Sequence, residues 1–414
     1  MSTLQNDNLE TTLQPVRPLP LWRNRNFLLL ISGQGVSAIG TQVSQFAFPL
    51  LILALTHSPA QAGLITALRG LPYTLFSLPA GALVDRWNRK LVMIVCDTGR
   101  AIALASIPIA FAFGIMNIAQ LCLVSLIEGT LFVFFHMAES TTLPHVVALE
   151  QLPAAAGQNE VLNSSSILIG PSIGGILYTF SSLLPFLADA ISYTFSIVSL
   201  LFIRVPFQKE RVNKQQNLWI EVKEGLSWLW HQHLIRFTAI VTGGMIISSI
   251  GYTLIVIVIA QSMHASSFII GLFFASGGAG SVVGAFLIAP LQKRFDFGRV
   301  MIASTWIWAL SWLLFAFAFN PLLLGIANAL NYIIVTIFLV SQFSYRLALI
   351  PDALQGRVNS VFRLIAFGGQ PIGLALTGIL LQSIGTLATI LVLFVPQLVL
   401  AILVTVNRDV RGAR

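Results

Sequence analysis

Long runs of apolar residues alternate with short polar connections along most of the chain. A helix needs about 20 apolar residues to cross a bilayer, whereas a strand of an outer-membrane barrel alternates apolar and polar positions over about 10 residues. The runs are too long and too continuous for barrel strands, so we predict an all-α membrane protein. Twelve spans can be delimited, at residues 26–55, 61–84, 91–114, 118–142, 159–180, 184–203, 237–261, 268–291, 300–319, 321–345, 359–382 and 386–406.

The composition agrees with a chain that is surrounded by lipid. Hydrophobic residues make up 56% and charged residues 9% of the 414 residues, whereas a soluble domain carries about 25% charged residues. This argues against a soluble enzyme, a nucleic-acid-binding domain and a disordered chain. Cys96 and Cys122 lie in apolar runs and form neither a disulfide framework nor a metal-ligand spacing. No nucleophile motif occurs either, so we expect no enzyme activity, metal or cofactor.

The basic residues are placed on one side of the predicted bundle. Of the 23 Lys and Arg residues, 21 fall in the termini or in connections on the same side. The other two, Arg69 and Arg100, lie inside spans 2 and 3. The positive-inside rule therefore places both termini in the cytoplasm. The net charge of +8 is a topology signal and an attraction to anionic lipid, with no nucleic-acid partner implied.

The two parts of the chain look like repeats of six spans each. Loop 2–3 (85–90) and loop 8–9 (293–299) are both basic, and a Gly/Pro-rich stretch in span 5 (170–175) returns in span 11 (368–373). Parallel six-span repeats with a site between them are a known transporter architecture. We predict these domains: an N-terminal segment 1–25, a first half 26–204, a linker 205–236, a second half 237–406 and a tail 407–414.

The linker contains a predicted interfacial helix from Leu218 to Arg236. Apolar residues recur there at helical spacing with charged residues between them. The helix serves either as a tether on the inner leaflet or in regulation.

Two motifs resemble the major facilitator superfamily. Gly81 to Lys90 is similar to its loop 2–3 signature, and Gly170-Pro171-x-x-Gly174-Gly175 resembles the span 5 motif associated with antiporters. The stretches Leu71 to Arg100 and Ile350 to Val358 resemble a bacterial branch that includes macrolide efflux pumps and the enterobactin exporter. The resemblance covers nearly the whole chain and implies twelve helices in two parallel six-helix repeats.

The resemblance also implies gating roles. A carboxylate at Asp85 would favour helix N-terminal amides and latch span 11 in the outward-facing state. Gly81 should let helices approach closely, and Arg86 and Arg89 act either in this latch or as membrane anchors. The span 5 motif is either a hinge or seal, or ordinary small-residue packing. The gating candidates are Gly81, Asp85, Arg86, Arg89, Gly170, Pro171, Gly174, Gly175 and, in the second half, Asp296.

The chain departs from the family pattern at two places. Asn88 replaces the usual glycine of the loop 2–3 turn, and we expect it to be tolerated because Asn visits the left-handed backbone region more readily than most residues. Span 4 lacks the basic residue that many drug antiporters carry there, so their proton coupling does not transfer unchanged.

Four acidic residues lie inside predicted spans and need partners or a cavity. Asp97 and Arg100 are three residues apart on one helix and can pair, as a structural pair or as a proton site. Glu128 lies halfway along span 4 with no basic residue within a helical turn. We expect it to be the proton site, with a carboxyl kept neutral by burial as the alternative. Glu139 is expected near the cytoplasmic exit, and Asp189 in span 6 is assigned a structural role.

Polar and aromatic residues form stripes on single faces of spans 1, 4, 7 and 10, which line the central cavity in the superfamily. Interhelical hydrogen bonding is the alternative explanation. The predicted cavity residues are Gln34, Ser37, Thr41, Gln45, Phe132, Phe135, Thr242, Ser249, Tyr252, Asn328, Asn331 and Gln342.

The sequence therefore predicts a secondary transporter that exports drug-like or amphiphilic small molecules, with the proton as coupling ion. We expect a monomer that spans the bacterial inner membrane. The alternatives are an importer or lysolipid facilitator of the same fold and a membrane sensor that does not transport. Substrate identity is not encoded in these motifs.

Overall fold

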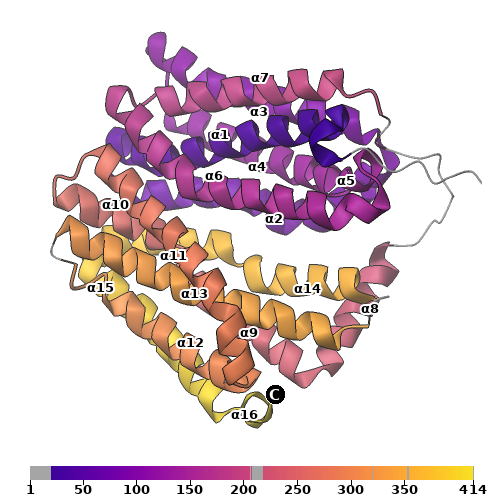
Figure 1. Cartoon of the computed structure of the whole chain (residues 1–414). Coiled ribbons are helices and arrows are strands. Elements are labelled where there is room, and N and C mark those ends of the chain that lie inside the picture. The colour runs from indigo at the N-terminus through magenta and orange to yellow at the C-terminus, as the bar shows by residue number, and fades with distance from the viewer. Residues whose placement is uncertain (1–19, 206, 208–217, 319, 352–353, 414) are drawn as a thin grey trace, which may run out of the picture.

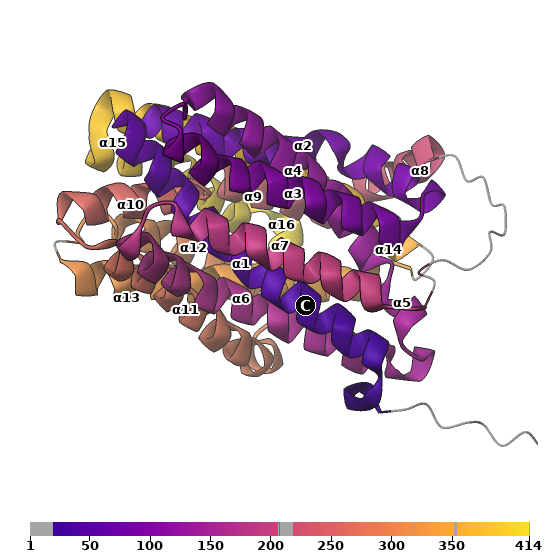
Figure 2. The same ribbon diagram turned by 90° about the horizontal axis from the view of Figure 1, so that it is seen from above.

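The chain folds into long helices arranged in two groups. The computed structural model describes residues 20–205, 207, 218–318, 320–351 and 354–413, without the side chains of Leu78, Ala82, Asp85 and residues 218–221. Most of the predicted N-terminal segment lies outside the described residues. Figure 1 shows the first group above the second, and Figure 2, turned by 90°, shows the long helices running side by side.

The first half consists of six long helices: α1 (Arg25–Thr56), α2 (Pro59–Arg86), α3 (Arg89–Ala112), α4 (Ile118–Ser140), α6 (Leu152–Phe180) and α7 (Leu184–Phe202). Short helices accompany them: η1 (Leu21–Arg23), α5 (Leu143–Val146) and η2 (Leu149–Gln151). Asn and Ser side chains begin four of the long helices by accepting a backbone hydrogen bond at the N-cap, at Asn24, Ser58, Asn88 and Asn117.

The second half contains α9 (His233–Ser249), α10 (Tyr252–Ser262), α11 (Ser267–Arg294), α12 (Phe297–Leu313), α13 (Pro321–Leu349), α14 (Gln355–Phe367), α15 (Gln370–Val406) and α16 (Arg408–Gly412). Gly385 lies in the left-handed region, with φ of 78°, and divides α15 into two legs. A glycine suits this turn because it lacks the Cβ that makes positive φ costly.

The prediction of an all-helical membrane bundle is confirmed. Among the described residues, nine helices are long and apolar enough to cross a membrane. Each of the twelve predicted ranges overlaps a helix. The nine candidates become twelve when α2 and α12 are added and the two legs of α15 are counted as two helices. Large apolar side chains face outward on many of them, for example Ile102 at 66% and Phe286 at 78% exposure, as expected for lipid contact.

The linker helix α8 (Leu218–His231) belongs to the second half. It packs against α14 and α9, and Leu229 is buried in a cluster with Val358 and Phe362. Glu224 of α8 pairs with Arg357 of α14 at 2.5 Å. The predicted helix is therefore present, but it ends at His231. One of its faces packs on α14 and α9, and its contact with the membrane surface stays a prediction.

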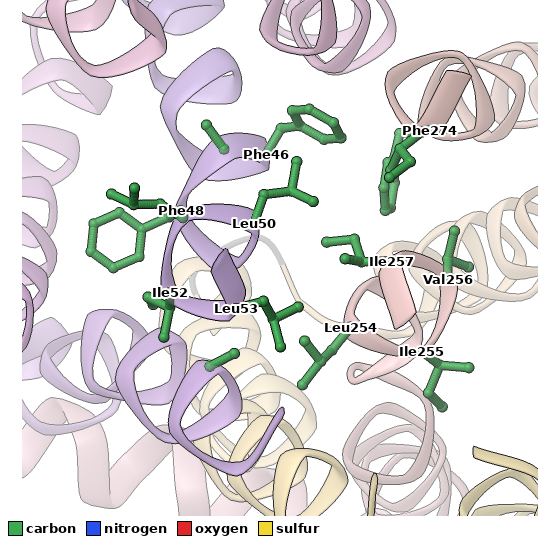
Figure 3. Close-up of a cluster of buried hydrophobic side chains, with 14 of the residues drawn as sticks. Phe46, Phe48, Leu50, Ile52, Leu53, Leu254, Ile255, Val256, Ile257 and Phe274 are labelled. Carbon is green, nitrogen blue, oxygen red and sulfur yellow. The ribbon is translucent and has the colours of Figure 1, made fainter. Parts of the chain in front are cut away.

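The two halves share a hydrophobic core at one end only. We call this the basic-free end, because its connections, at residues 57–58, 113–117, 181–183 and 263–266, contain no Lys or Arg; the opposite end is the basic end. Figure 3 shows Phe46, Leu50 and Leu53 of α1 facing residues of α10 and α11 within one buried cluster. At the basic end, separate clusters serve each half.

Glycine pairs bring helices of the two halves into contact at the basic-free end. A Cβ at Gly63 of α2 would lie 2.8 Å from Cα of Gly378 of α15, and a Cβ at Gly175 of α6 would lie 3.2 Å from Cα of Gly271 of α11. Small residues such as glycine let helix backbones approach this closely. The halves are therefore closely packed at this end.

Candidate functional site

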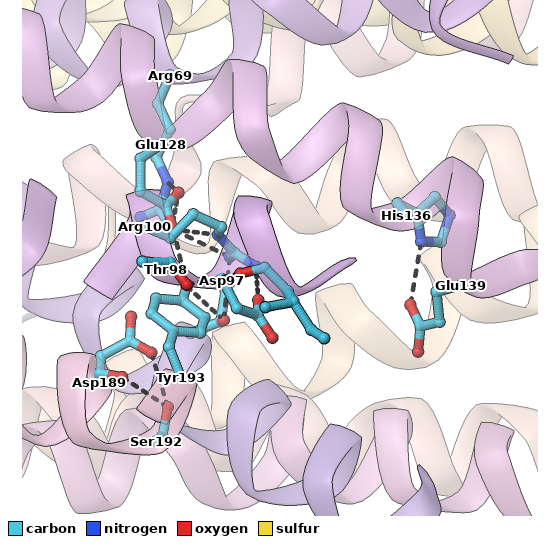
Figure 4. A network of polar contacts seen from close by, with 12 residues as sticks. Arg69, Asp97, Thr98, Arg100, Glu128, His136, Glu139, Asp189, Ser192 and Tyr193 are labelled. Carbon is cyan, nitrogen blue, oxygen red and sulfur yellow. Dashed lines mark hydrogen bonds and ion pairs between the residues drawn. The ribbon is translucent and has the colours of Figure 1, made fainter. Parts of the chain in front are cut away.

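A cluster of charged side chains is buried inside the first half. Figure 4 shows its members converging from four helices: Arg69 of α2, Asp97 and Arg100 of α3, Glu128 of α4, and Asp189 and Tyr193 of α7. We call these six residues the polar cluster. Asp97 and Asp189 are 0% exposed, Glu128 is 1% exposed and Arg100 is 2% exposed.

Glu128 is the centre of the polar cluster. Its Oε2 accepts a hydrogen bond from Nε of Arg69 at 3.0 Å, and its Oε1 accepts one from Nε of Arg100 at 2.9 Å. Further guanidinium contacts lie at 2.9 Å from each oxygen. The Tyr193 hydroxyl donates to Oε1 at 2.7 Å. Charge-assisted hydrogen bonds of this kind stabilise the ionised carboxylate.

Glu128 therefore has counter-ions from other helices, and these favour an ionised carboxylate over one kept neutral by burial. No basic residue lies within a turn on α4, but α2 and α3 each supply one. Gly129 makes this approach possible, because a Cβ there would lie 2.0 Å from the carbonyl oxygen of Arg69. The backbone of α2 thus lies directly against α4 beside Glu128.

Arg100 connects Glu128 to the rest of the polar cluster. Its guanidinium carbon lies 4.2 Å from the centroid of the Tyr193 ring, a cation–π contact. One Nη donates to the Thr41 hydroxyl at 3.3 Å, and the other lies 3.7 Å from Oδ1 of Asp97. The predicted Asp97–Arg100 pair is thus present as a longer ionic contact, while the short contacts of Arg100 go to Glu128.

Asp97 and Asp189 are the poorly satisfied members of the polar cluster. Neither oxygen of Asp97 has a hydrogen-bond partner among the described atoms, and Oδ2 of Asp189 also has none. Oδ1 of Asp189 accepts from the Ser192 hydroxyl at 3.1 Å. Buried polar atoms are almost always paired, so these carboxyl groups are the unusual feature of the site.

Two partners in this site were not expected from sequence. Arg69 is visible in the sequence as a basic residue inside a span, but nothing in the sequence joins it to Glu128. No sequence pattern marks Tyr193. A signal did exist, since two intramembrane arginines require acidic partners and Glu128 lies halfway along the neighbouring span.

The predicted cavity residues of α1 and α4 differ in exposure. Gln34 and Ser37 are buried, Gln45 is exposed, and Thr41 joins the Tyr193 hydroxyl at 3.0 Å. Phe135 is buried in the core of the first half. Phe132 is 37% exposed and stacks on His136 with ring centroids 5.8 Å apart. His136 in turn lies 3.7 Å from Glu139, apart from the polar cluster.

Most of the predicted cavity residues of the second half bond to neighbouring helices. Thr242 donates to Gln342 at 2.8 Å, Asn331 donates to Ser311 at 3.1 Å, and Asn328 donates to the Phe273 carbonyl at 2.6 Å. The Tyr252 hydroxyl meets that of Tyr332, and Ser249 bonds within α9. The bonds between helices agree with the alternative explanation of the polar stripes, which is interhelical hydrogen bonding. That these residues line a substrate cavity stays a prediction.

The span 5 motif contacts both halves. Gly170 and Gly174 lie against α1, where a Cβ would come within 2.3 Å of the Gln42 side chain and 2.9 Å of Phe46, respectively. Gly175 lies against α11 of the other half, and a Cβ at Gly271 of that helix would lie 2.5 Å from the carbonyl oxygen of Pro171. This geometry agrees with close packing of helices through small residues. A role of the motif as a hinge or seal stays a prediction.

The loop 2–3 residues correct two expectations. Asn88 has φ of −69°, outside the left-handed region, and caps α3 by accepting from the Leu91 amide. Among the described residues, a Cβ at Gly81 would meet nothing within 4 Å, so this part of the structure does not show the expected close helix approach. Arg89 donates to the Thr141 carbonyl at the end of α4 at 3.2 Å, and Lys90 donates to the Ile203 carbonyl beyond α7 at 2.7 Å.

The remaining gating candidates lie at the basic end. The side chain of Asp85 is outside the described residues, while Arg86 is exposed at the end of α2. Asp296 precedes α12 and lies 3.9 Å from Arg299. It borders a pocket of about 330 Å³ between α11, α12 and α13. Among the described residues, no group of three or more His, Cys, Asp and Glu side chains could hold a metal ion.

Comparison with known protein families shows which family the chain belongs to. A family model described as "transmembrane secretion effector" matches residues 16–413, almost the whole length. The chain belongs to the transmembrane secretion effector family. This confirms the resemblance to the major facilitator superfamily, whose members are membrane transporters rather than enzymes.

Relatives of this chain include efflux pumps. It is 25% identical over 389 residues to the multidrug efflux pump Tap of Mycobacterium tuberculosis, covering 90% of this chain and 92% of the pump. It is 28% identical over 205 residues to macrolide efflux protein A of Streptococcus pyogenes, covering 49% and 51% of the two chains. The efflux branch expected from the sequence motifs is thus confirmed.

Solved transporters share the fold of this chain. The nucleoside transporter NupG superposes with a TM-score of 0.76 at 16% identity, over 94% of this chain and all of that one. A bacterial homologue of the iron transporter ferroportin gives 0.73 in its inward-facing state, over 92% and 98% of the chains, at 15% identity. The outward-facing state of the same homologue gives 0.61, over 92% and 98%, at 16% identity.

Proposed function

We propose that this chain is a secondary active exporter of drug-like or amphiphilic small molecules, which works by alternating access and is coupled to protons. The observation that carries the proposal is the unequal packing of the two halves. They share one hydrophobic core at the basic-free end, whereas each half has its own core at the basic end. Two rigid bodies held together at one end are suited to rocking about a site between them.

The distribution of basic residues and the packing of the halves together indicate an inward-facing conformation. The positive-inside rule assigns the basic end to the cytoplasm, with both termini inside. The end at which the halves are packed together is then extracellular, and the conformation is inward-facing. The higher TM-score to the inward-facing ferroportin homologue, 0.73 against 0.61, supports this assignment. We place the protein in the bacterial inner membrane as a monomer.

The direction of transport is supported by the relatives. Tap, which aligns over most of both chains, is described as a multidrug efflux pump. The proposed cavity surface, which combines amide, hydroxyl and aromatic side chains such as Gln34, Thr41 and Phe132, fits an amphiphilic ligand. Coupling is assigned to the polar cluster, because buried ionisable groups in transporters commonly serve proton relays.

Transport into inverted membrane vesicles tests the proposal. Vesicles that contain the protein are given an acidic interior and supplied with a macrolide antibiotic and, separately, with a lipophilic cationic dye. We expect accumulation of at least one compound against its own gradient, with loss of accumulation when an ionophore collapses the pH gradient. Vesicles without the protein are the control.

Two results would contradict the proposal. Uptake that only equilibrates the compound, with or without a pH gradient, would indicate a facilitator. Binding without transport across a wide panel would favour a sensor.

A further inference from the structure

The polar cluster contains more carboxyl groups than guanidinium groups. Arg69 and Arg100 supply two positive charges, and Glu128, Asp97 and Asp189 supply three carboxyl groups, all within the described part of the first half. The cluster is buried, so an unbalanced charge is costly there. It is neutral when one of the three carboxyl groups carries a proton.

The contacts show which carboxyl group does not need that proton. Glu128 holds both guanidinium groups within 3.0 Å and accepts from the Tyr193 hydroxyl. Protonation would disrupt these charge-assisted bonds. The proton therefore belongs on Asp97 or Asp189.

Asp97 and Asp189 differ in their ionic environment. Asp97 lies 3.7 Å from the guanidinium of Arg100. Asp189 forms no ion pair within 4.0 Å among the described residues. The Ser192 hydroxyl donates to Oδ1 of Asp189 at 3.1 Å and also points to the Asp189 backbone carbonyl at 2.8 Å, and the Ser44 hydroxyl of α1 is a second neighbour. A serine hydroxyl has a single proton to donate, so Ser192 offers Asp189 at most a shared hydrogen bond.

Among the described residues, the cations that act on Asp189 are Arg100 and Arg69, and neither lies within 4.0 Å of its carboxyl group. On its own helix it is followed one turn later by Tyr193, and the charged groups that act on it from neighbouring helices are Glu128, Arg100 and Arg69. From α1 it faces Ser44 and Gly40. Gly40 is required there, since a Cβ would lie 2.7 Å from Oδ1 of Asp189. The missing side chain of Gly40 thus leaves space for the Asp189 carboxyl group beside the uncharged hydroxyl of Ser44.

We propose that Asp189 is the proton-binding residue of the polar cluster, protonated in this conformation, and that Asp97 stays ionised beside Arg100. This assigns a titrating role to a residue for which the sequence indicated only a structural one. The use of this proton in transport rests on the proposed function, but its presence on Asp189 does not. Release of the proton would leave one net negative charge in the cluster.

Infrared spectroscopy of the full-length protein in liposomes tests the assignment without any substrate. A protonated carboxyl group has a carbonyl stretch that ionised surface carboxylates lack at neutral pH. We expect this band in the wild type. Replacing either Asp97 or Asp189 by Asn leaves two carboxyl groups for two guanidinium groups, so the band should be lost in both variants. No band in the wild type, or a band that persists in Asp189→Asn, would overturn the proposal.

Two milder variants keep all three carboxyl groups, so they identify the one that carries the proton and also serve if Asp189→Asn does not fold. Ser192→Ala removes the hydroxyl beside Asp189, so it should shift the band to higher frequency. The matched control is Ser196→Ala, because Ser196 neighbours Asp97 and should leave the band in place. The reverse pattern would assign the proton to Asp97.

A transport arm separates this inference from the proposed function. In inverted vesicles with an acidic interior, Asp189→Asn should reduce accumulation of the macrolide to the level of empty vesicles while exchange of the macrolide without a gradient continues. If the wild type itself shows no pH-driven accumulation, the proposed function fails and the infrared result still decides the protonation. Full pH-driven accumulation by Asp189→Asn would overturn the coupling role.

Discussion

Glu128 is bonded to side chains from three other helices, and its carboxylate is the only described group that contacts both intramembrane arginines. Removing one partner of a buried ion pair leaves the other charge without compensation. In this cluster two guanidinium groups would be affected together. Glu128 is therefore expected to matter for folding before it matters for transport.

Glu128→Gln should lower the free energy of unfolding by about 3–5 kcal/mol, the usual cost of breaking a buried pair. Thermal unfolding in detergent would report this as a clear fall in Tm. Glu139→Gln is the matched control, because the Glu139 side chain is 21% exposed and lies 3.7 Å from His136. Equal melting of both variants would show that the ion pairs contribute little.

Residue contacts could be predicted from the sequence only where they lie on one helix. The i, i+3 spacing of Asp97 and Arg100 indicated their proximity, and the 3.7 Å contact agrees. The bond from Arg69 to Glu128 joins residues 59 positions apart. It depends on how α2 packs against α4, which helical periodicity does not encode.

At the scale of elements, glycines determine how closely helices of the two halves pack. Gly63 and Gly378 place α2 against α15, and Gly175 and Gly271 place α6 against α11. These contacts all lie near the basic-free end. Enlarging one of these residues should therefore separate the halves at that end.

Gly378→Val should increase access to the basic-free end, because even a Cβ at Gly378 would lie 2.6 Å from the Pro59 carbonyl oxygen. A reporter cysteine at Leu53, which is 6% exposed, should react with a maleimide faster in this variant than in the parent. Gly157→Ala is the control, since a Cβ there meets nothing within 4 Å. An unchanged labelling rate would mean that the halves do not separate at this contact.

The positions of the helices followed from the apolar runs, but their interruptions did not. The Gly/Pro-rich stretches of spans 5 and 11 looked equivalent in sequence. In the structure α6 continues through Pro171, whereas α14 ends at Phe367 and α15 begins at Gln370. A proline inside a helix bends it or breaks it depending on the helices packed around it, and these are unknown from one sequence.

At the scale of the whole molecule, charge predicts orientation while packing determines the conformation. The distribution of Lys and Arg gave an inside and an outside before any contact was known. It could not indicate which end is packed together, because a transporter visits both states with one sequence. The shared core around Phe46 and Phe274 supplies that information.

Cysteine labelling in intact cells should report the orientation. On a background without Cys96 and Cys122, cysteines at Ser58 and Ser266 of the basic-free end should react with an impermeant maleimide. A cysteine at Ser227 of α8 should react only after the membrane is opened. Labelling of Ser227 in intact cells, without labelling of the other two, would invert the assigned topology.

The packing of α8 on α14 predicts where the chain can be divided into two fragments that reassemble. Since α8 covers Leu229, Val358 and Phe362, the second half begins at Leu218 as a folding unit. Two polypeptides that end at residue 207 and start at residue 218 should therefore reassemble when they are co-expressed, and a tag on one should copurify the other. A second fragment that starts at His233 would expose the apolar surface beneath α8, so we expect it to be degraded before it finds its complement.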